Sequence, residues 1–525
     1  VYDEDQPSGY GLNEMKVDGV RLELPNNRNV MADDHFKHKK SNGYDLIGNI
    51  GLTVDFAPWL KFKTAYAYRG YYTNTKYHSE KFTADVQGQQ LYPYNYDYNS
   101  YWFEQTFDNV LTFDKTFGKH SLNVMAGSSL TAARKDWSQI NVEGKKTVYD
   151  VVNGKLDIKD EAAGFFDPTS PTIDAGNGGT FTGNGSFWNY NRASFFGRVN
   201  YSYGGKYMLQ ATVRADGSSK FSPEHRWGYF PAAAFGWRLS EETFMEGTKD
   251  WLDNLKVRLS YGTVGNDGIS SDLWSQTWTS ETDLRYQYIL NNQYSSSYDL
   301  STEQMANKNL KWETTITRNF GFDFGFLKNR LWGSLDLYWN TTKDLLMLTS
   351  LPGITGFTST YDNIGQTSNK GIEFSLSGVI FENKDWNITA GMNINFNKGK
   401  VDKLAENVTG LYGSSWCGSS SFPGEDYILQ EGKPVGMVRG FIYDGFYTTD
   451  DFNYVNGQYI LKEGVADLGS FINPVHGVDR PSGQNAYPGL PKFRDMDNSG
   501  SIDEKDVTII GDMNPVHTGG FNINT

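Results

Sequence analysis

The feature that most constrains this chain is a period-two alternation of apolar and polar residues, repeated in paired segments. Residues 49–56 alternate in this way, and residues 60–68 return after the turn Ala57-Pro58-Trp59. Because successive side chains of a β-strand point to opposite faces, each segment has one apolar and one polar face. Five further pairs follow, at residues 107–113 and 122–126, 195–203 and 207–213, 235–237 and 255–261, 320–326 and 331–339, and 372–380 and 386–396. With a last half-pair at Phe521 and Ile523, the pattern predicts an all-β chain of about 12 antiparallel strands plus part of another.

The lengths of the strands and of their connections separate a membrane barrel from a soluble sandwich, which also alternates. The alternating segments suggest strands of about ten residues, enough to cross a bilayer at a tilt, whereas soluble strands average about five or six. Turns within pairs are mostly tight, as at 203–206 and 327–330, and only residues 240–254 leave room for a short helix. Most connections between pairs are long, at roughly 73–103, 135–191, 265–313, 342–369 and 399–515. This asymmetry predicts a transmembrane antiparallel up-and-down β-barrel with long extracellular loops.

Composition excludes several other classes of protein. No run of 18 or more uncharged apolar residues occurs, so a helical membrane protein is excluded. The formal net charge of -14 argues against nucleic acid as a partner. The single cysteine, Cys417, allows neither an internal disulfide nor a cysteine-based zinc site. No export signal is visible after Val1, as expected of a processed chain or of a part of one.

Because successive strands of an up-and-down barrel cross the membrane in alternate directions, each segment of the chain can be assigned to a side of the membrane. Residues 1–45 are predicted to be an extracellular loop leading into the barrel, and residues 46–398 to hold the barrel hairpins. The strand that ends near Asn397 rises outward, and the strand that starts in 516–525 must descend. Residues 399–515 therefore form a large extracellular excursion, which includes the strand-like stretch 436–443.

Several longer blocks of sequence stand in a fixed order. They are RADGSSKFSPEHRWGYFPAAAFGWRLSEE at 214–242, NLKWETT at 309–315, EGKPVGMVRGFIYDGFY at 431–447 and the run from Phe493 to Asn522. In this order they resemble the SusC/RagA family of TonB-dependent outer-membrane importers, and the similarity extends from about residue 45 onward. The resemblance implies that the chain is part of a 22-stranded barrel. Members of this family also have a plug and a TonB-contacting segment, which this stretch does not show. The last strand, at Phe521 and Ile523, is expected to be only part of a hairpin.

The function implied by the resemblance is import of a nutrient across the cell outer membrane. The expected partners are a SusD-like surface lipoprotein, TonB acting through the N-terminal region, outer-membrane lipid and the cargo. An oligosaccharide is the first choice of cargo, and a peptide is the alternative. A rival class is a surface binding or adhesion β-protein without transport, which would purify without detergent.

The segment 495–506 has the spacing of a calcium-binding loop. Oxygen-bearing residues fall at positions 1, 3, 5, 7, 9 and 12 of an EF-hand register, with Gly500 at position 6 for the tight turn. The predicted Ca²⁺ ligands are Asp495, Asp497, Ser499, Ser501 (through its carbonyl), Asp503 and Asp506. Asp506 replaces the usual Glu and reaches less far. A solvated acidic turn is the alternative interpretation.

Aromatic residues are concentrated in the predicted long loops. Aromatic faces stack on sugar rings, although girdle formation, loop packing and contact with a partner protein also explain exposed rings. The candidate residues for ligand or partner contact are Tyr94, Tyr96, Tyr98, Tyr101, Trp102, Trp188, Trp274 and Trp278.

Signatures of enzymes are missing from the sequence. The seven histidines form no HExxH motif, and no GxSxG motif or P-loop occurs. The sequence therefore predicts a protein that is not an enzyme.

Overall fold

A computed structural model describes residues 37–79, 94–143, 182–276, 304–405, 426–469, 481 and 483–525 with their side chains, and the backbone of short strands between these ranges. The chain folds as two compact units. Residues 1–111 and 127–194 form the first unit, and residues 112–126 and 195–525 form the second. Cys417 and the side chain of Trp278 lie outside the described residues. No helix among the described residues is long and apolar enough to span a bilayer.

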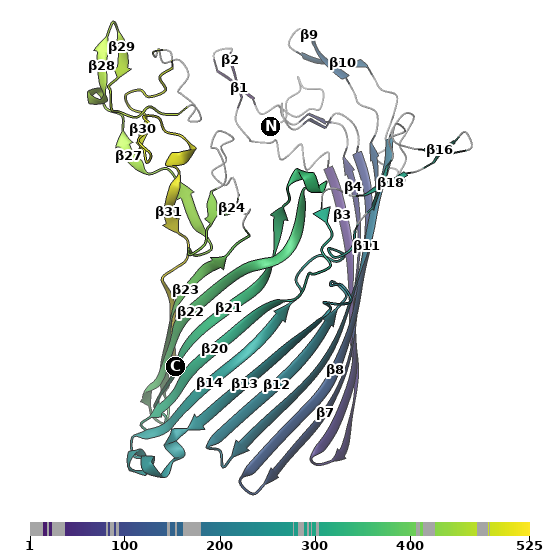
Figure 1. Ribbon diagram of the computed structural model, residues 1–525, viewed down its shortest axis with the longest axis vertical. Coiled ribbons are helices and arrows are strands. Elements are labelled where there is room, and N and C mark those ends of the chain that lie inside the picture. Colours follow the sequence, from purple (N-terminus) through teal and green to yellow (C-terminus); the bar gives the residue numbers. More distant parts are fainter. Residues whose placement is uncertain are drawn as a thin grey trace. The chain divides into compact units, whose positions relative to one another are not determined.

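One large antiparallel sheet contains all twelve predicted strands and the final half-pair (Figure 1). Its strands are hydrogen-bonded in chain order, and the two-residue β19 (Gln304–Met305) joins β22 in parallel. The strands are β3 (Lys37–Ala57), β4 (Leu60–Ser79), β7 (Tyr94–Phe117), β8 (His120–Glu143), β11 (Thr180–Tyr203), β12 (Tyr207–Ser218), β13 (Trp227–Arg238), β14 (Leu252–Asn266), β20 (Glu313–Phe326), β21 (Leu331–Ser350), β22 (Ser359–Glu382), β23 (Asn387–Lys403) and β32 (His517–Asn524).

Smaller elements lie before β3 and in the connections between the strands of the large sheet. Two-stranded pairs are formed by β1 (Glu14–Val17) with β2 (Val20–Glu23), β5 (Phe82–Thr83) with β6 (Gln89–Gln90), β9 (Val148–Val152) with β10 (Lys155–Asp160), β15 (Trp278–Glu281) with β18 (Ser297–Leu300), and β16 (Tyr288–Leu290) with β17 (Gln293–Ser295). Short 3-10 helices are η1 (Leu239–Glu241), η2 (Thr243–Thr248), η4 (Gly353–Thr355), η5 (Thr449–Asp451) and η6 (Glu504–Asp506). The second lies in the connection 240–254, where the sequence predicts a short helix, and the first overlaps its start.

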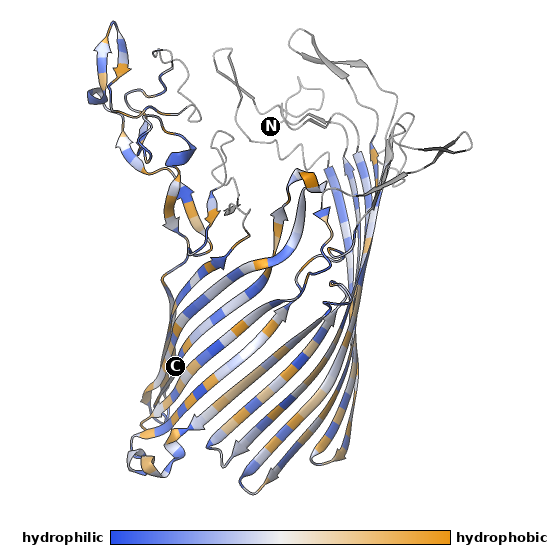
Figure 2. Cartoon of the chain, viewed as in Figure 1, coloured by the Kyte–Doolittle hydropathy of each residue, from blue (hydrophilic) through white to orange (hydrophobic). Residues whose placement is uncertain are grey.

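The register of the sheet places the apolar residues of neighbouring strands opposite one another. Phe320 lies opposite Leu337, which lies opposite Ile372, whereas the next residues along, Gly321, Asp336 and Glu373, form a row on the other face. Figure 2 shows the resulting alternation of hydrophobic and hydrophilic residues along the strands. The predicted all-β, antiparallel fold class is confirmed.

Strand lengths differ from the predicted ten residues, because the long strands of the sheet run past the apolar alternation. β4 continues to Ser79, and β7 begins at Tyr94. β21 and β22 extend toward each other, so the connection predicted at 342–369 shrinks to 351–358. The barrel stretch predicted at 46–398 likewise starts at Lys37 and ends at Lys403. At these strand ends both faces carry polar residues, so the alternation of apolar and polar residues stops although the backbone hydrogen bonds continue. The sequence pattern therefore does not predict the strand ends.

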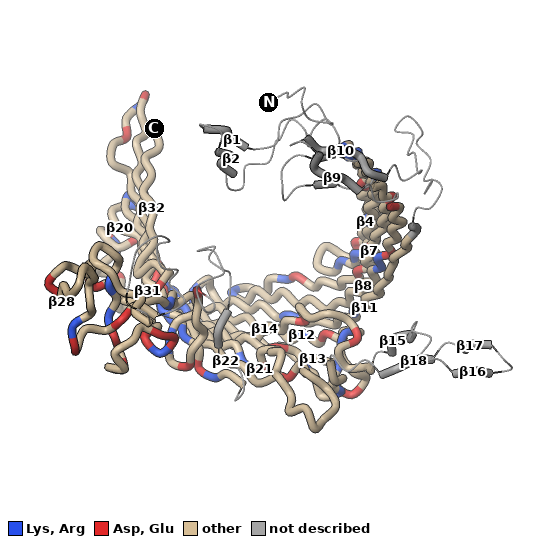
Figure 3. The backbone as a smooth tube through the Cα atoms, turned by 90° about the horizontal axis from the view of Figure 1, so that it is seen from above, with Lys and Arg blue, Asp and Glu red and all other residues tan. Residues whose placement is uncertain are grey.

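The segment between β23 and β32 builds several small sheets of its own. β24 (Gly410–Tyr412), β25 (Tyr427–Leu429), β26 (Met437–Gly440) and β31 (Thr508–Asp512) form one of them, and β27 (Tyr443–Phe446) pairs with β30 (Pro491–Phe493) and β28 (Phe452–Val455) with β29 (Gln458–Leu461). The strand-like stretch predicted at 436–443 is thus β26, outside the large sheet. Figure 3 shows charges of both signs along the segment from β28 to β31.

This segment has its own small core, made by Tyr447, Phe452, Leu468 and Ala486. The Tyr447 hydroxyl donates to the Ala466 carbonyl at 2.6 Å. Burial, with the nearby carboxylates of Asp467 and Asp451, raises the pKa of the Tyr447 phenol. The phenol therefore stays protonated and keeps donating its hydrogen bond.

A second core joins two connections of the large sheet. Phe221, Phe230, Leu310 and Trp312 are buried together, and the Trp312 Nε1–H donates to the Arg226 carbonyl at 2.9 Å. Phe221 lies in the connection between β12 and β13, and Leu310 in the one before β20. These connections hold one another in place by apolar packing.

Substituting Phe221→Ala should release the β12–β13 connection. Phe221 is fully buried (0% exposed), and removing a buried phenylalanine costs about 3–5 kcal/mol. Trypsin should then cleave faster after Lys220 or Arg226 in the refolded or membrane-embedded protein. The matched control is Phe244→Ala, whose ring is 69% exposed in η2. Equal cleavage rates in the two variants would contradict the packing role of Phe221.

Candidate functional site

A hollow of about 570 Å³ lies in the first unit of the chain, on the polar face of the sheet. Its lining includes Asp45, Arg69, Tyr98, Trp102, Lys135 and Trp188, and we call it the aromatic hollow. The register of β3 and β4 places Asp45 opposite Tyr71 and Arg69 opposite Ile47, on the face away from Ile50 and Tyr66. Three of the eight predicted contact residues thus come together here.

Charged groups in the aromatic hollow are held in fixed positions. The Arg69 guanidinium donates to Asp45 through Nη2 at 3.0 Å and through Nε at 3.4 Å. The same guanidinium lies 5.9 Å from the centre of the Trp102 ring. A planar cation between a carboxylate and an indole face keeps one orientation, so its remaining N–H groups point in a defined direction.

The other predicted aromatic residues take different positions. Tyr94 and Tyr96 lie further along β7 on the same face, where Tyr96 stacks on Tyr77 at 5.1 Å. Tyr101 lies on the opposite face, and its hydroxyl is 2.9 Å from that of Tyr68. Trp274 belongs to the second unit, and its Nε1 is buried without a partner among the described residues. The expectation of a loop at 94–102 was wrong, because all of these β7 residues are on a strand.

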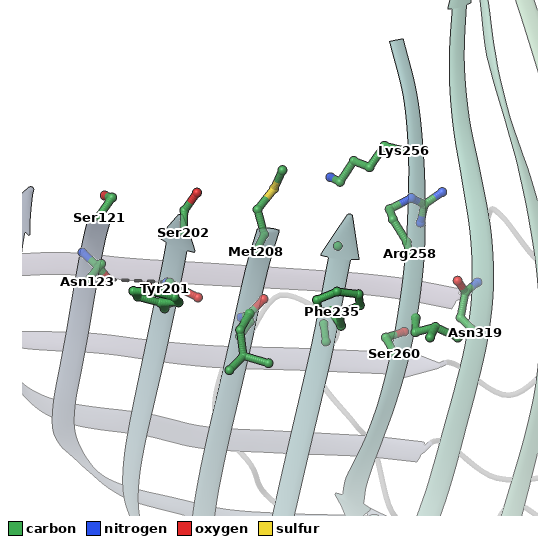
Figure 4. A pocket seen from close by; sticks show the side chains of 16 residues that line it. Ser121, Asn123, Tyr201, Ser202, Met208, Phe235, Lys256, Arg258, Ser260 and Asn319 are labelled. Atoms are coloured by element: carbon green, nitrogen blue, oxygen red, sulfur yellow. Dashed lines mark hydrogen bonds between the residues drawn. The ribbon is translucent and has the colours of Figure 1, made fainter. Parts of the chain in front are cut away.

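The second unit has a pocket of about 400 Å³ on the sheet, lined by both polar and apolar residues (Figure 4). Figure 4 shows Ser121, Ser202 and Met208 projecting in the same direction from β8, β11 and β12. Beside them on β14, Arg258 pairs with Asp323 at 2.9 Å and with Asp336 at 3.0 Å. This network crosslinks β14, β20 and β21 and gives the polar face a fixed charge pattern.

The acidic loop 495–506 brings three of its six predicted ligands together. Carboxylate oxygens of Asp495, Asp497 and Asp506 lie within 4.8 Å of one another. Asp495 accepts hydrogen bonds from the Ser499 and Gly500 amides at 3.1 and 2.8 Å, which curls the loop around this carboxylate. Gly500 has φ +82°, a left-handed conformation that glycine adopts without strain.

The remaining three predicted ligands take part in local hydrogen bonds. The Ser499 hydroxyl donates to the Ser501 carbonyl at 2.8 Å, the oxygen expected to bind the ion. Asp503 caps η6 by accepting from the Lys505 amide at 2.8 Å. Asp506 is fully buried and accepts from the Met496 and Asp503 amides at 2.6 and 2.7 Å. A carboxylate oxygen has two lone pairs, so these bonds leave acceptor capacity for a cation.

Asp467 ties this loop to the small core, a role that sequence spacing does not reveal. Its amide donates to the Gly500 carbonyl and its carbonyl accepts from the Ile502 amide, each at 2.9 Å. Its carboxylate accepts from the Ala486 amide at 2.6 Å.

The sequence analysis also did not predict Lys135 or the Asp45–Arg69 pair as residues of the aromatic hollow. Counting back from the tight turn at 57–60 places Asp45 and Arg69 on neighbouring rows of one face, so that pair could have been found.

Comparisons with known proteins identify the family of this chain. Residues 5–490 match the family described as TonB dependent receptor-like, beta-barrel. TonB-dependent receptor P3 of Formosa agariphila is 29% identical over 508 residues, which cover 94% of this chain and 44% of that relative. TonB-dependent receptor SusC of Bacteroides thetaiotaomicron is 30% identical over 390 residues, which cover 72% of this chain and 35% of SusC.

Solved structures share the fold. The structure of the RagAB peptide transporter matches with a TM-score of 0.69 at 20% identity, over 98% of this chain and 49% of that chain. The chain therefore spans less than half the length of these relatives. They are receptors or transporters by name, and the prediction that this chain is not an enzyme is confirmed.

Substituting Asp467→Ala should loosen the acidic loop and the segment near Ala486 together. The variant removes the carboxylate that accepts the Ala486 N–H, a loss of about 1–3 kcal/mol for a buried donor. Hydrogen exchange should become faster in peptides that cover 484–490 and 495–506. Asp450→Ala, a neighbouring exposed carboxylate, is the control. Unchanged exchange in the Asp467 variant would show that its carboxylate does not anchor the loop.

Proposed function

Because the chain belongs to the TonB-dependent receptor-like β-barrel family and is of the SusC/RagA type, we propose that it forms part of the wall of an outer-membrane importer. The protein would take up a nutrient in a TonB-dependent manner, beneath a SusD-like surface lipoprotein. TonB would act through the N-terminal region of the full-length protein. The observation that carries this proposal is the aromatic hollow on the polar face, where a barrel of this family meets its cargo or its plug.

An oligosaccharide fits the aromatic hollow best. Trp102 and Trp188 offer flat apolar faces to sugar rings, and the oriented Asp45–Arg69 pair offers acceptors and donors to hydroxyl groups. Ligand sites commonly combine aromatic walls with a few fixed polar groups in this way. A peptide is the second candidate, because Arg69 and Lys135 would pair with its carboxylates.

Replacing the two indoles should weaken cargo binding. In the full-length receptor, Trp102→Ala with Trp188→Ala should lower the affinity for the preferred cargo at least about tenfold, since aromatic side chains dominate such contacts. Calorimetry with a panel of neutral hexose oligosaccharides and a panel of short peptides measures both affinity and cargo class. Trp251→Ala, at the tight-turn end of the sheet, is the control.

Two outcomes of this experiment oppose the proposal. Undiminished affinity in the double variant would show that the aromatic hollow does not bind the cargo. Binding of the peptides alone would replace the oligosaccharide assignment and leave import intact.

We also propose that residues 495–506 bind Ca²⁺ as a structural clamp. Support comes from the three converging carboxylates and from the curl of the loop around Asp495. No long helices flank the loop, only the three-residue η6. The ion would therefore stiffen a surface segment rather than move helices as a calcium sensor does.

Chelation should make this loop more accessible to trypsin, whose sites Arg494 and Lys505 flank and interrupt it. EGTA should speed cleavage at these sites in the wild-type protein, and added Ca²⁺ should reverse the effect. Asp495→Asn with Asp497→Asn should be cleaved quickly in either condition. If neither EGTA nor Ca²⁺ changes the cleavage rate of the wild-type protein, the loop is a solvated acidic turn and not a calcium site.

A further inference from the structure

A row of basic residues lies next to a row of apolar residues on one face of β21, β22 and β23. Both rows are near the ends of these strands that lie away from the tight turns. Leu337, Ile372 and Phe396 lie opposite one another in the sheet and form an apolar row. Two residues further along, the next row on the same face contains Trp339, Lys370 and Lys398. Directly opposed residues share a face, so the two ammonium groups stand side by side above the apolar row.

The hydrogen-bond ladder beside this row is interrupted. Pairing of β23 with β32 ends at Phe396 and His517. Val401 then bonds to a different segment, donating to the Lys433 carbonyl at 2.9 Å and accepting from the Gly432 amide at 2.7 Å. Alternate residues of an antiparallel strand direct their N–H and C=O groups to the same side, so Asn397 and Gly399 face that side as well. Among the described residues, Gly399 has no backbone hydrogen-bond partner there.

A hollow of about 1130 Å³ lies at this interruption. Its apolar lining includes Trp339, Ile372, Phe396 and Val516. Its charged lining consists of Lys370, Lys398, Lys400 and Asp512. The three lysines outnumber the one carboxylate, in a chain whose formal net charge is -14.

Two of these lysines are available to an external anion. Lys400 pairs with Asp402 at 3.0 Å, and Asp512 accepts from the Asn514 amide and side chain at 2.9 and 2.7 Å. Lys370 and Lys398 form no ion pair among the described residues. The hollow therefore combines two unpaired ammonium groups, one unpaired backbone N–H group and an apolar floor.

The depth of the row matches the edge of the hydrocarbon. Lys398 lies eleven steps along the strand from the start of β23 at Asn387. At about 3.4 Å per residue and a tilt of about 40°, this is roughly 29 Å of height. The apolar band of an outer-membrane barrel is about 25 Å tall, so the lysines reach the head-group level.

We propose that this hollow binds the phosphate-bearing head group of a lipid in the outer leaflet. Lys370 and Lys398 pair with the phosphate, and the Gly399 amide donates to one of its oxygens. An acyl chain lies along Ile372 and Phe396, with Trp339 at the level of the head group. The site rests on the chain's location in the outer membrane, and it is independent of the cargo.

The test compares lipid binding by the full-length receptor, released from the outer membrane in mild detergent, using native mass spectrometry. Phosphorylated lipid A and dephosphorylated lipid A are titrated into the wild type, into Lys370→Gln with Lys398→Gln, and into Lys384→Gln. Lys384 lies in the tight turn at the other end of the same hairpin and is the control for loss of charge. Heat-modifiable migration in gels verifies that each variant is folded.

The wild type and Lys384→Gln should bind phosphorylated lipid A about equally. The double variant should bind it at least about tenfold more weakly, and the dephosphorylated lipid should bind weakly to all three. Equal binding by wild type and double variant would overturn the proposal, as would equal binding of the two lipids. Loss of a co-purified surface lipoprotein in the double variant, with lipid binding unchanged, would assign the lysines to a protein partner instead.

Discussion

Hydrogen bonding between neighbouring strands is the constraint on which the rest of this structure depends. Within a bilayer no water is available for backbone amides, so each strand must find its partners in the adjacent strands. The ladder from β3 to β32 meets this requirement strand by strand in chain order. The interruption beside Gly399 lies at head-group height, where water or phosphate oxygens can act as partners.

The same ladder explains which parts of the fold the sequence predicts. Alternation fixes the six hairpins, because a slip of one residue would turn every apolar side chain of a strand to the polar face. It says nothing of the strand ends, where residues such as Thr341 or Tyr96 remain paired without an apolar row. Local spacing predicts the turn at Gly500 and the carboxylates of Asp495 and Asp497. It misses Asp467 and Lys135, because they reach their sites from distant segments.

The two faces of the sheet and the segment between β23 and β32 serve different purposes. The polar face carries oriented charges, as in Arg69 with Asp45 and Arg258 with Asp323 and Asp336. The apolar face ends in a row of lysines that suits anionic lipid. The intervening segment folds on its own small core, and Asp467 joins that core to the acidic loop. The contacts proposed with cargo, lipid and metal therefore lie on separate parts of the fold.

The sheet is expected to cross the outer membrane with residues 404–515 outside the cell, and labelling of intact cells tests this orientation. In a Cys417→Ser background, one cysteine replaces Glu463 near β29, or Lys384 in the tight turn between β22 and β23. A maleimide that cannot cross the membrane should label position 463 in intact cells, and position 384 only after lysis. Equal labelling of both positions in intact cells, or recovery of the protein without membranes or detergent, would contradict the account.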